Sequence, residues 1–202
     1  MSINEIADKL EALFPHSLAR FEFNGFLTSF PKHKTQANIA FTLGYSEQAI
    51  TRAIKEKVDL LVVHNAPESL VPEKNNYFES IAKRVRESSL SVYRLHLPLD
   101  FVRGGIIDQL CRMMKLNAIP ATLFYQGQRI TGGVYLSSGS FTVDEVIKRV
   151  KLLRPSTIRL VKGGKEKVKN IAITSGDGCK PEFLLQLKPD VFICGLLNQE
   201  SI

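Results

Sequence analysis

The chain has 202 residues, of which 44% are hydrophobic and 23% charged, and its formal net charge is +7. This composition is that of a globular protein with a filled core, so it excludes intrinsic disorder as the main state. No uncharged stretch reaches the roughly 18 apolar residues of a transmembrane helix, and residues 1–14 lack the layout of a secretion signal. We therefore expect a cytoplasmic protein. Its three cysteines include no C-x-x-C pair, which excludes a disulfide framework.

In the first half of the chain, predicted helices alternate with predicted strands. Ser2 and Glu5 form a capping box that begins a helix, and Pro15 ends the apolar repeat of that helix. The all-apolar run at residues 60–63 predicts a strand that is buried on both faces. Hydrophobic patterning predicts further strands at 37–43 and 90–95, and further helices at 49–54, 78–85 and 105–115. This alternation is typical of a parallel sheet with helices on both faces.

The pattern changes near residue 118. The predicted elements that follow are a hairpin of strands at 122–125 and 129–136, a helix at 143–153, strands at 157–162 and 168–173, a helix at 181–187 and a strand at 190–194. We therefore expect an α/β protein of two α/β lobes, 1–118 and 119–202, with mainly parallel sheet and helices on both faces. Residues 190–202 are expected to return to a site in the first lobe.

Polar residues collect directly after the buried strands. Ligands bind at the carboxyl ends of parallel strands, because these ends and the helix N-termini open onto the same crevice. Histidine and carboxylate side chains at this edge could bind zinc, manganese or iron. The residues concerned are His64 and Asn65, His96 and Asp100, the loop Gly176-Asp177-Gly178, and the segment 195–200.

Each of these residues also has an ordinary structural interpretation. A histidine at a strand end is often a hydrogen-bonded structural residue. Asp100 could be an N-cap ahead of Gly104 and Gly105. The loop Gly176-Asp177-Gly178 could be a tight turn that uses the conformational freedom of glycine, or it could bind a phosphate. Spacing alone leaves these alternatives open.

Four segments together resemble one protein family. The strand with its polar end, 59–65, is similar to a family strand that ends in two adjacent histidines. Residues 92–100 are similar to the His-x-x-x-Asp segment, which Gly104, Gly105 and Asp108 follow here as they do in the family. The stretches 168–178 and 190–195 resemble the closing strand, glycine loop and last strand. This family is the Nif-three-like one, often described as GTP cyclohydrolase 1 type 2 homologues.

The resemblance implies a two-lobed α/β subunit, a ring-shaped hexamer and a dinuclear metal centre. His64 matches the first of the paired histidine ligands, Asp100 the carboxylate shared between the metals, and His96 the histidine four residues before that acid. Three positions depart from the pattern, and one of them is Gly44, which replaces an acid that usually ends the first strand. Asn65 replaces the second histidine, and Glu200 replaces a histidine of the last motif. A further ligand, a glutamate, would fall beyond Ile202, so the ligand set within this chain is incomplete.

Three functions follow as hypotheses. The first is a metal-dependent hydrolase that acts on a nucleotide or another phosphorylated small molecule, in which His96 orients or shuttles protons and the loop Gly176-Asp177-Gly178 holds an anionic group. The second is a catalytically inactive, oligomeric scaffold or binding protein. The third is a nucleic-acid binder that uses the basic segment 146–169, although a solvated surface would explain the same charges.

Overall fold

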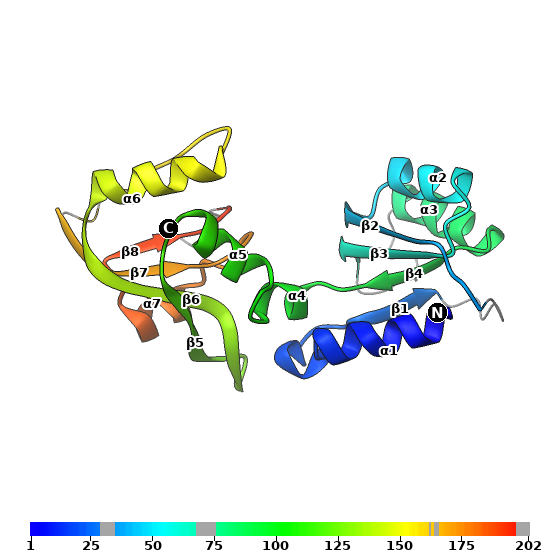
Figure 1. Ribbon diagram of the computed structural model, residues 1–202, viewed down its shortest axis with the longest axis horizontal. Helices are drawn as coiled ribbons and strands as arrows, with labels where there is room; N and C mark the ends of the chain where they lie inside the picture. Colours follow the sequence, from blue (N-terminus) through cyan, green and yellow to red (C-terminus); the bar gives the residue numbers. More distant parts are fainter. Residues whose placement is uncertain (29–34, 68–75, 162, 164–165, 197–202) are drawn as a thin grey trace. The chain divides into compact units, whose positions relative to one another are not determined.

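A computed structural model describes residues 1–28, 35–67, 76–161, 163 and 166–196 of the chain (Figure 1). The backbone forms two compact units, Met1–Leu99 and Asp100–Ile202. The division falls inside the short helix α4 (Leu97–Phe101), earlier in the chain than the boundary near residue 118 that the sequence suggested. Within the described ranges, no helix combines the length and the apolar character that a membrane span requires.

The sheet of the first unit has four strands in the order β1-β4-β3-β2. Strands β2, β3 and β4 are parallel to one another, and β1 is antiparallel to β4. Because β3 and β4 are adjacent and parallel, their carboxyl ends lie side by side at one edge of the sheet. The bounds are β1 (Gly25–Thr28), β2 (Ile39–Gly44), β3 (Leu60–Asn65) and β4 (Ser91–Arg94).

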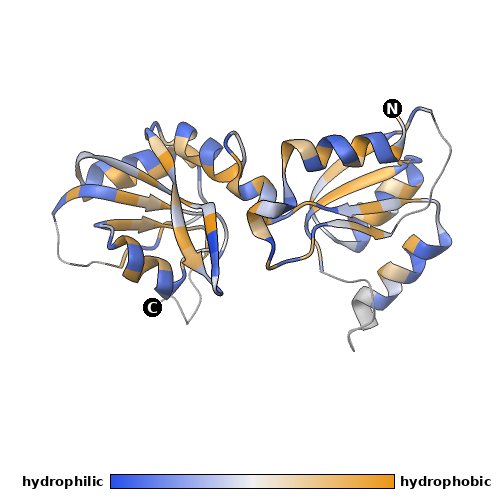
Figure 2. Ribbon diagram, turned by 90° about the horizontal axis from the view of Figure 1, so that it is seen from below, coloured by the Kyte–Doolittle hydropathy of each residue, from blue (hydrophilic) through white to orange (hydrophobic). Residues whose placement is uncertain are grey.

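Helices cover both faces of this sheet, as the sequence predicts. Helix α1 (Ile3–Leu13) starts at the capping box of Ser2 and Glu5, and its apolar side packs on one face with Leu60 and Val62. Figure 2 shows this division of α1 into an apolar and a polar side. Helices α2 (Glu47–Lys55) and α3 (Asn76–Glu87) contribute to a second cluster, with the alternate β3 residues Leu61 and Val63. The two clusters explain why β3 is apolar along its whole buried length.

The sheet of the second unit has the order β5-β6-β7-β8, and its β7–β8 pair alone is parallel. The expectation of mainly parallel sheet is therefore wrong for this unit, because β5, β6 and β7 follow one another as antiparallel neighbours. The predicted hairpin is confirmed, since Gln126 and Gly127 both have positive φ angles, as a tight two-residue turn requires. Together, the two units confirm the α/β class. The bounds are β5 (Ala118–Tyr125), β6 (Gln128–Thr142), β7 (Lys167–Ile173) and β8 (Val191–Ile193).

The helices of the second unit are close to their predicted positions, but one predicted strand is wrong. The helices are α5 (Ile106–Met113), α6 (Val143–Val150) and α7 (Pro181–Leu187). Residues 157–161 form no strand, because the apolar side chains Ile158, Leu160 and Val161 are exposed and pair with no neighbouring strand in the described sheets. The last residue of this prediction, Lys162, lies outside the described residues.

Helix α6 begins at a capping box whose stabilising effect can be measured. The Thr142 hydroxyl accepts a hydrogen bond from the Glu145 backbone N–H at 3.2 Å, and the Glu145 carboxylate accepts one from the Thr142 N–H at 2.7 Å. We expect Thr142→Ala to lower the free energy of unfolding by about 1 kcal/mol, as measured by urea denaturation. Ser140→Ala, at an exposed neighbouring position, is the control and should change it by less than about 0.5 kcal/mol. Equal effects of the two substitutions would contradict this role of the cap.

Candidate metal centre

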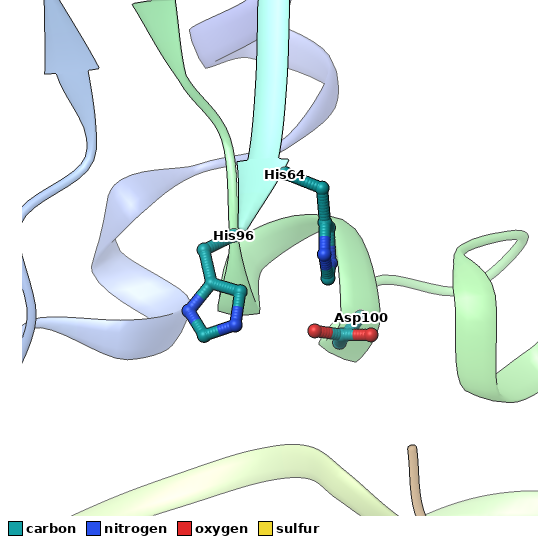
Figure 3. A group of neighbouring side chains, drawn as sticks. All are labelled: His64, His96 and Asp100. Atoms are coloured by element: carbon teal, nitrogen blue, oxygen red, sulfur yellow. The ribbon is translucent and has the colours of Figure 1, made fainter. Parts of the chain in front are cut away.

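Three side chains converge at the carboxyl ends of β3 and β4. His64 lies at the end of β3, His96 follows β4, and Asp100 lies on α4, one helical turn after His96. Each offers one ligand atom, and these atoms lie within 4.8 Å of one another (Figure 3). Among the described residues, no other group of three or more His, Cys, Asp or Glu side chains comes this close. The structure thus brings together three of the predicted residues.

The side chain of His96 is oriented by Glu22. Its Nδ1 lies 2.8 Å from Glu22 Oε2 and 3.2 Å from Arg94 Nη2. Carboxylates only accept hydrogen bonds and guanidinium groups only donate them, so one Nδ1 atom cannot bond to both. The shorter contact identifies Nδ1–H as the donor to Glu22, and the lone pair of the ring then lies on Nε2. In Figure 3 the ring of His96 presents a nitrogen toward Asp100.

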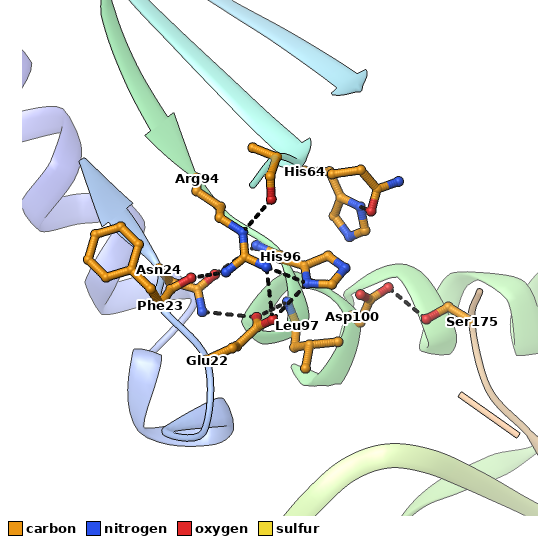
Figure 4. Close-up of polar contacts among 11 residues, drawn as sticks. Glu22, Phe23, Asn24, His64, Arg94, His96, Leu97, Asp100 and Ser175 are labelled. Atoms are coloured by element: carbon orange, nitrogen blue, oxygen red, sulfur yellow. Dashed lines mark hydrogen bonds and ion pairs between the residues drawn. The ribbon is translucent and has the colours of Figure 1, made fainter. Parts of the chain in front are cut away.

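Glu22 itself belongs to a buried polar cluster (Figure 4). Its side chain is 7% exposed and that of its ion-pair partner Arg94 is 6% exposed. Glu22 Oε1 accepts from the Asn24 side chain and from the Leu97 backbone N–H, while Arg94 donates to the carbonyl groups of Phe23 and Ala66. Burial acts to raise the pKa of Glu22, but hydrogen bonds from His96, the Leu97 N–H and the Asn24 side chain lower it overall, so the carboxylate is ionised at neutral pH.

His64 has a weaker partner of the same kind. Its Nδ1 lies 3.2 Å from Oδ1 of Asn65, and since an amide oxygen only accepts, Nδ1 carries the proton in this arrangement. The lone pair of His64 therefore lies on Nε2, as in His96. The two imidazole rings pack edge to face, with their centroids 4.9 Å apart. Asn65, which the resemblance aligned with a metal ligand, here contacts His64.

Asp100 is 2% exposed, and its carboxylate accepts a hydrogen bond from the Ser175 hydroxyl at 2.8 Å. The interpretation of Asp100 as an N-cap is wrong, because Asp100 lies inside α4 and Gly105 is the N-cap of α5. A buried carboxylate needs compensating partners, and a cation bound beside it would be one. This position therefore suits a metal ligand better than a cap.

The donor set fits a single divalent ion. Two imidazole nitrogens and one carboxylate oxygen match the ligands of catalytic zinc sites, in which three protein ligands leave a coordination position open. Ligand atoms that bind one ion tetrahedrally at 2.0–2.2 Å lie about 3.3–3.6 Å apart. The atoms of this group lie within 4.8 Å of one another, so binding one ion would require them to approach one another by at most about 1–1.5 Å.

The other predicted positions do not join this group. Glu200 lies outside the described residues. The loop Gly176-Asp177-Gly178 makes the contacts of a tight turn: the Gly178 N–H donates to the Ser175 carbonyl, and the Gly176 carbonyl accepts from Leu196. A Cβ atom on Gly178 would lie 2.2 Å from the Thr174 hydroxyl, which explains the glycine. An anion site at this loop stays a prediction.

The basic segment 146–169 includes one residue with a clear structural role. Arg149 donates hydrogen bonds to the carbonyl groups of Met114 and Lys115, and its guanidinium lies 5.3 Å from the centre of the Phe141 ring. Lys162 and Lys165 lie outside the described residues. Arg149 thus stabilises the fold of the second unit, and nucleic-acid binding by this segment stays a hypothesis.

Four residues of the site are not apparent from the sequence, namely Glu22, Asn24, Arg94 and Ser175. Glu22 and His96 are 74 positions apart in the chain. Glu22 precedes β1, a short strand that the hydrophobic pattern does not indicate. Only the position of an acidic side chain between two phenylalanines could have singled out Glu22.

The fold and the site together define a class of protein. It is an α/β protein of two units, with a candidate metal centre of two histidines and an aspartate at a strand edge. Over residues 1–201 the chain matches the family described as Duf34/NIF3 (NGG1p interacting factor 3). The chain belongs to this family, as the resemblance of its motifs predicted.

Two relatives agree with this membership, and a solved structure shares the fold. The chain is 31% identical over 147 residues to a GTP cyclohydrolase 1 type 2 homolog of Archaeoglobus fulgidus, and the aligned region covers 70% of this chain and 56% of the relative. It is 25% identical over 163 residues to the protein of the same name from Lactococcus lactis subsp. lactis, and the aligned region covers 78% of this chain and 63% of the relative. The matches thus span less than two thirds of the length of these relatives. A Bacillus cereus protein related to NIF3 has the same fold, with a TM-score of 0.78 at 16% identity over all of this chain and 84% of that protein.

Proposed function

We propose that this protein is a metal-dependent hydrolase that acts on a nucleotide or another phosphorylated small molecule, and that it uses one divalent ion held by His64, His96 and Asp100. The observation that carries the proposal is the approach of these three ligand atoms to within 4.8 Å of one another. The name of the two relatives, GTP cyclohydrolase 1 type 2 homolog, supports a nucleotide as the substrate class. The ion would be zinc, manganese or iron, since imidazole and carboxylate ligands suit all three.

Each residue of the site would have its own role. A divalent ion bound here would supply a Lewis acid that polarises a substrate oxygen and lowers the pKa of water. His64 and His96 would hold the ion through Nε2, and Asp100 would neutralise part of its charge. Ser175 would fix the orientation of the Asp100 carboxylate through its 2.8 Å hydrogen bond. His96 is then a ligand, and not the proton shuttle that the sequence suggested.

The proposal includes an assembly and a location. We propose a homo-oligomer, a hexameric ring as the family resemblance implies, in the cytoplasm. The loop Gly176-Asp177-Gly178 would hold an anionic group of the substrate, with backbone amides as donors. The runner-up is a family member without catalysis that serves as a scaffold or binding protein, and the replacement of a paired histidine by Asn65 is the observation in its favour.

Metal-loaded protein assayed against a panel of substrates tests the proposal. The purified chain would be loaded with one equivalent of Zn²⁺, Mn²⁺ or Fe²⁺ and incubated with GTP, nucleoside monophosphates and sugar phosphates, with products separated by chromatography. We expect turnover that depends on the metal and falls at least about 100-fold in His64→Ala. A matched substitution outside the site, His16→Ala, should leave turnover unchanged. Stoichiometric metal binding without turnover of any panel member would contradict the hydrolase and favour the scaffold.

A further inference from the structure

We propose that Glu22 is a positioning residue that sets which nitrogen of His96 is available to a metal ion. The inference rests on the proposed metal site and deepens it. It concerns a residue that touches neither metal nor substrate and acts only through His96. The observation behind it is that one nitrogen of His96 lies beside two oppositely charged side chains, Glu22 and Arg94.

These two side chains favour opposite tautomers of His96. The Glu22 carboxylate, 2.8 Å from Nδ1, only accepts hydrogen bonds and so favours the Nδ1–H form, with the lone pair on Nε2. Arg94, at 3.2 Å from the same Nδ1, only donates, and would favour the form with the lone pair on Nδ1. The closer carboxylate prevails. His96 therefore presents Nε2 as a ligand atom on the side of His64 and Asp100.

Glu22 is held in place by contacts that do not involve the imidazole. Its Oε1 accepts from the Leu97 N–H at 2.9 Å and from the Asn24 side chain at 3.0 Å, and the Asn24 Oδ1 accepts from the His96 backbone N–H at 2.8 Å. Both the backbone and the ring of His96 are thus fixed by the loop that carries Glu22 and Asn24. Because the Glu22 side chain is only 7% exposed, water competes poorly for its carboxylate. A histidine that binds a metal ion through one ring nitrogen commonly donates the N–H of the other to such a carboxylate, so Glu22 would hold His96 in the form that can bind an ion.

The contact between Asn65 and His64 is a weaker counterpart. A neutral amide at 3.2 Å on an exposed side chain orients its ring less firmly than a buried carboxylate at 2.8 Å. The two imidazoles thus share one tautomer, and that of His96 is imposed by the charge of Glu22.

Two substitutions that break the same ion pair separate positioning from stability. Glu22→Met removes the acceptor and leaves Arg94 beside Nδ1, whereas Arg94→Met removes the competing donor and leaves the acceptor. The first readout is the tautomer of His96 in metal-free protein, from the ¹⁵N chemical shifts of its side chain at a pH where imidazole is neutral. The second is the Kd for Zn²⁺, from competition with a chelator. If the buried charge prevents Glu22→Met from folding, the double variant Glu22→Met/Arg94→Met replaces it, since an apolar pair substitutes well for a buried ion pair.

We expect the Nδ1–H form in the parent protein and in Arg94→Met, and mainly the Nε2–H form in Glu22→Met. The Kd for Zn²⁺ should rise 10- to 100-fold in Glu22→Met and less than about 3-fold in Arg94→Met. Retention of the Nδ1–H form in Glu22→Met, or equal losses of affinity in both variants, would overturn the inference. A parent protein that binds no Zn²⁺ would refute the proposed function. The ¹⁵N shifts would still decide the role of Glu22, because they report the tautomer of His96 in metal-free protein.

Discussion

Asp100→Asn should abolish tight binding of a divalent ion, with a rise of more than about 100-fold in the Kd for Zn²⁺. The reason is charge: the amide keeps the shape of the side chain and an oxygen that accepts from Ser175, but it no longer balances a dication in a buried position. This rise in Kd is larger than the rise we expect from substituting a residue that only orients a ligand. Isothermal titration calorimetry of metal-free protein would measure it.

Asp177→Asn is the matched control for this experiment. The same chemical change is made in the same unit, at a side chain that is 60% exposed and lies 3.4 Å from the Lys180 ammonium. We expect its Kd for Zn²⁺ to stay within about 3-fold of that of the parent protein. If Asp100→Asn bound Zn²⁺ as tightly as Asp177→Asn, Asp100 would not be a ligand.

The second large effect concerns the backbone that supports Asp100. Gly132 lies on β6 with a φ of +97°, and a Cβ atom there would lie 2.1 Å from the carbonyl oxygen of Phe101, the residue after Asp100. Gly132→Ala combines this backbone clash with a disfavoured φ angle. We expect it to lower the free energy of unfolding of the Asp100–Ile202 unit by about 3–5 kcal/mol, as measured by urea denaturation.

Gly127→Ala separates the two contributions. Gly127 also has a positive φ, +75°, but a Cβ atom there would meet no heavy atom within 4 Å. We expect this variant to lose only about 1–2 kcal/mol, the contribution of the φ angle alone. Equal losses in the two variants would mean that β6 does not constrain the position of α4.

The three candidate ligand residues could be predicted because local rules place them. The all-apolar strand 60–63 is recognisable without its neighbours, and two parallel strands in sequence predict that His64 and His96 reach the same edge. Asp100 follows His96 by one helical turn, so its proximity is a consequence of α4. Hydrophobic periodicity does not indicate α4, because it has only five residues and contains Pro98.

The residues around the ligands could not be predicted, because they come together only through tertiary structure. Glu22 reaches His96 from a loop that has no periodic pattern, and Ser175 reaches Asp100 from the end of β7. The absence of the predicted strand from the described residues 157–161 has a related cause. The apolar residues there follow a strand-like pattern, but the described sheets offer them no neighbour, and they remain exposed. A local pattern indicates what a segment could form, and burial decides whether it does.

The most direct test of the metal centre is an anomalous-difference map from crystals grown with Zn²⁺, with data collected above and below the zinc absorption edge. We predict one peak at about 2.0–2.2 Å from Nε2 of His64, Nε2 of His96 and a carboxylate oxygen of Asp100. A map without a peak among these three side chains, at a Zn²⁺ concentration that saturates binding in solution, would contradict the account.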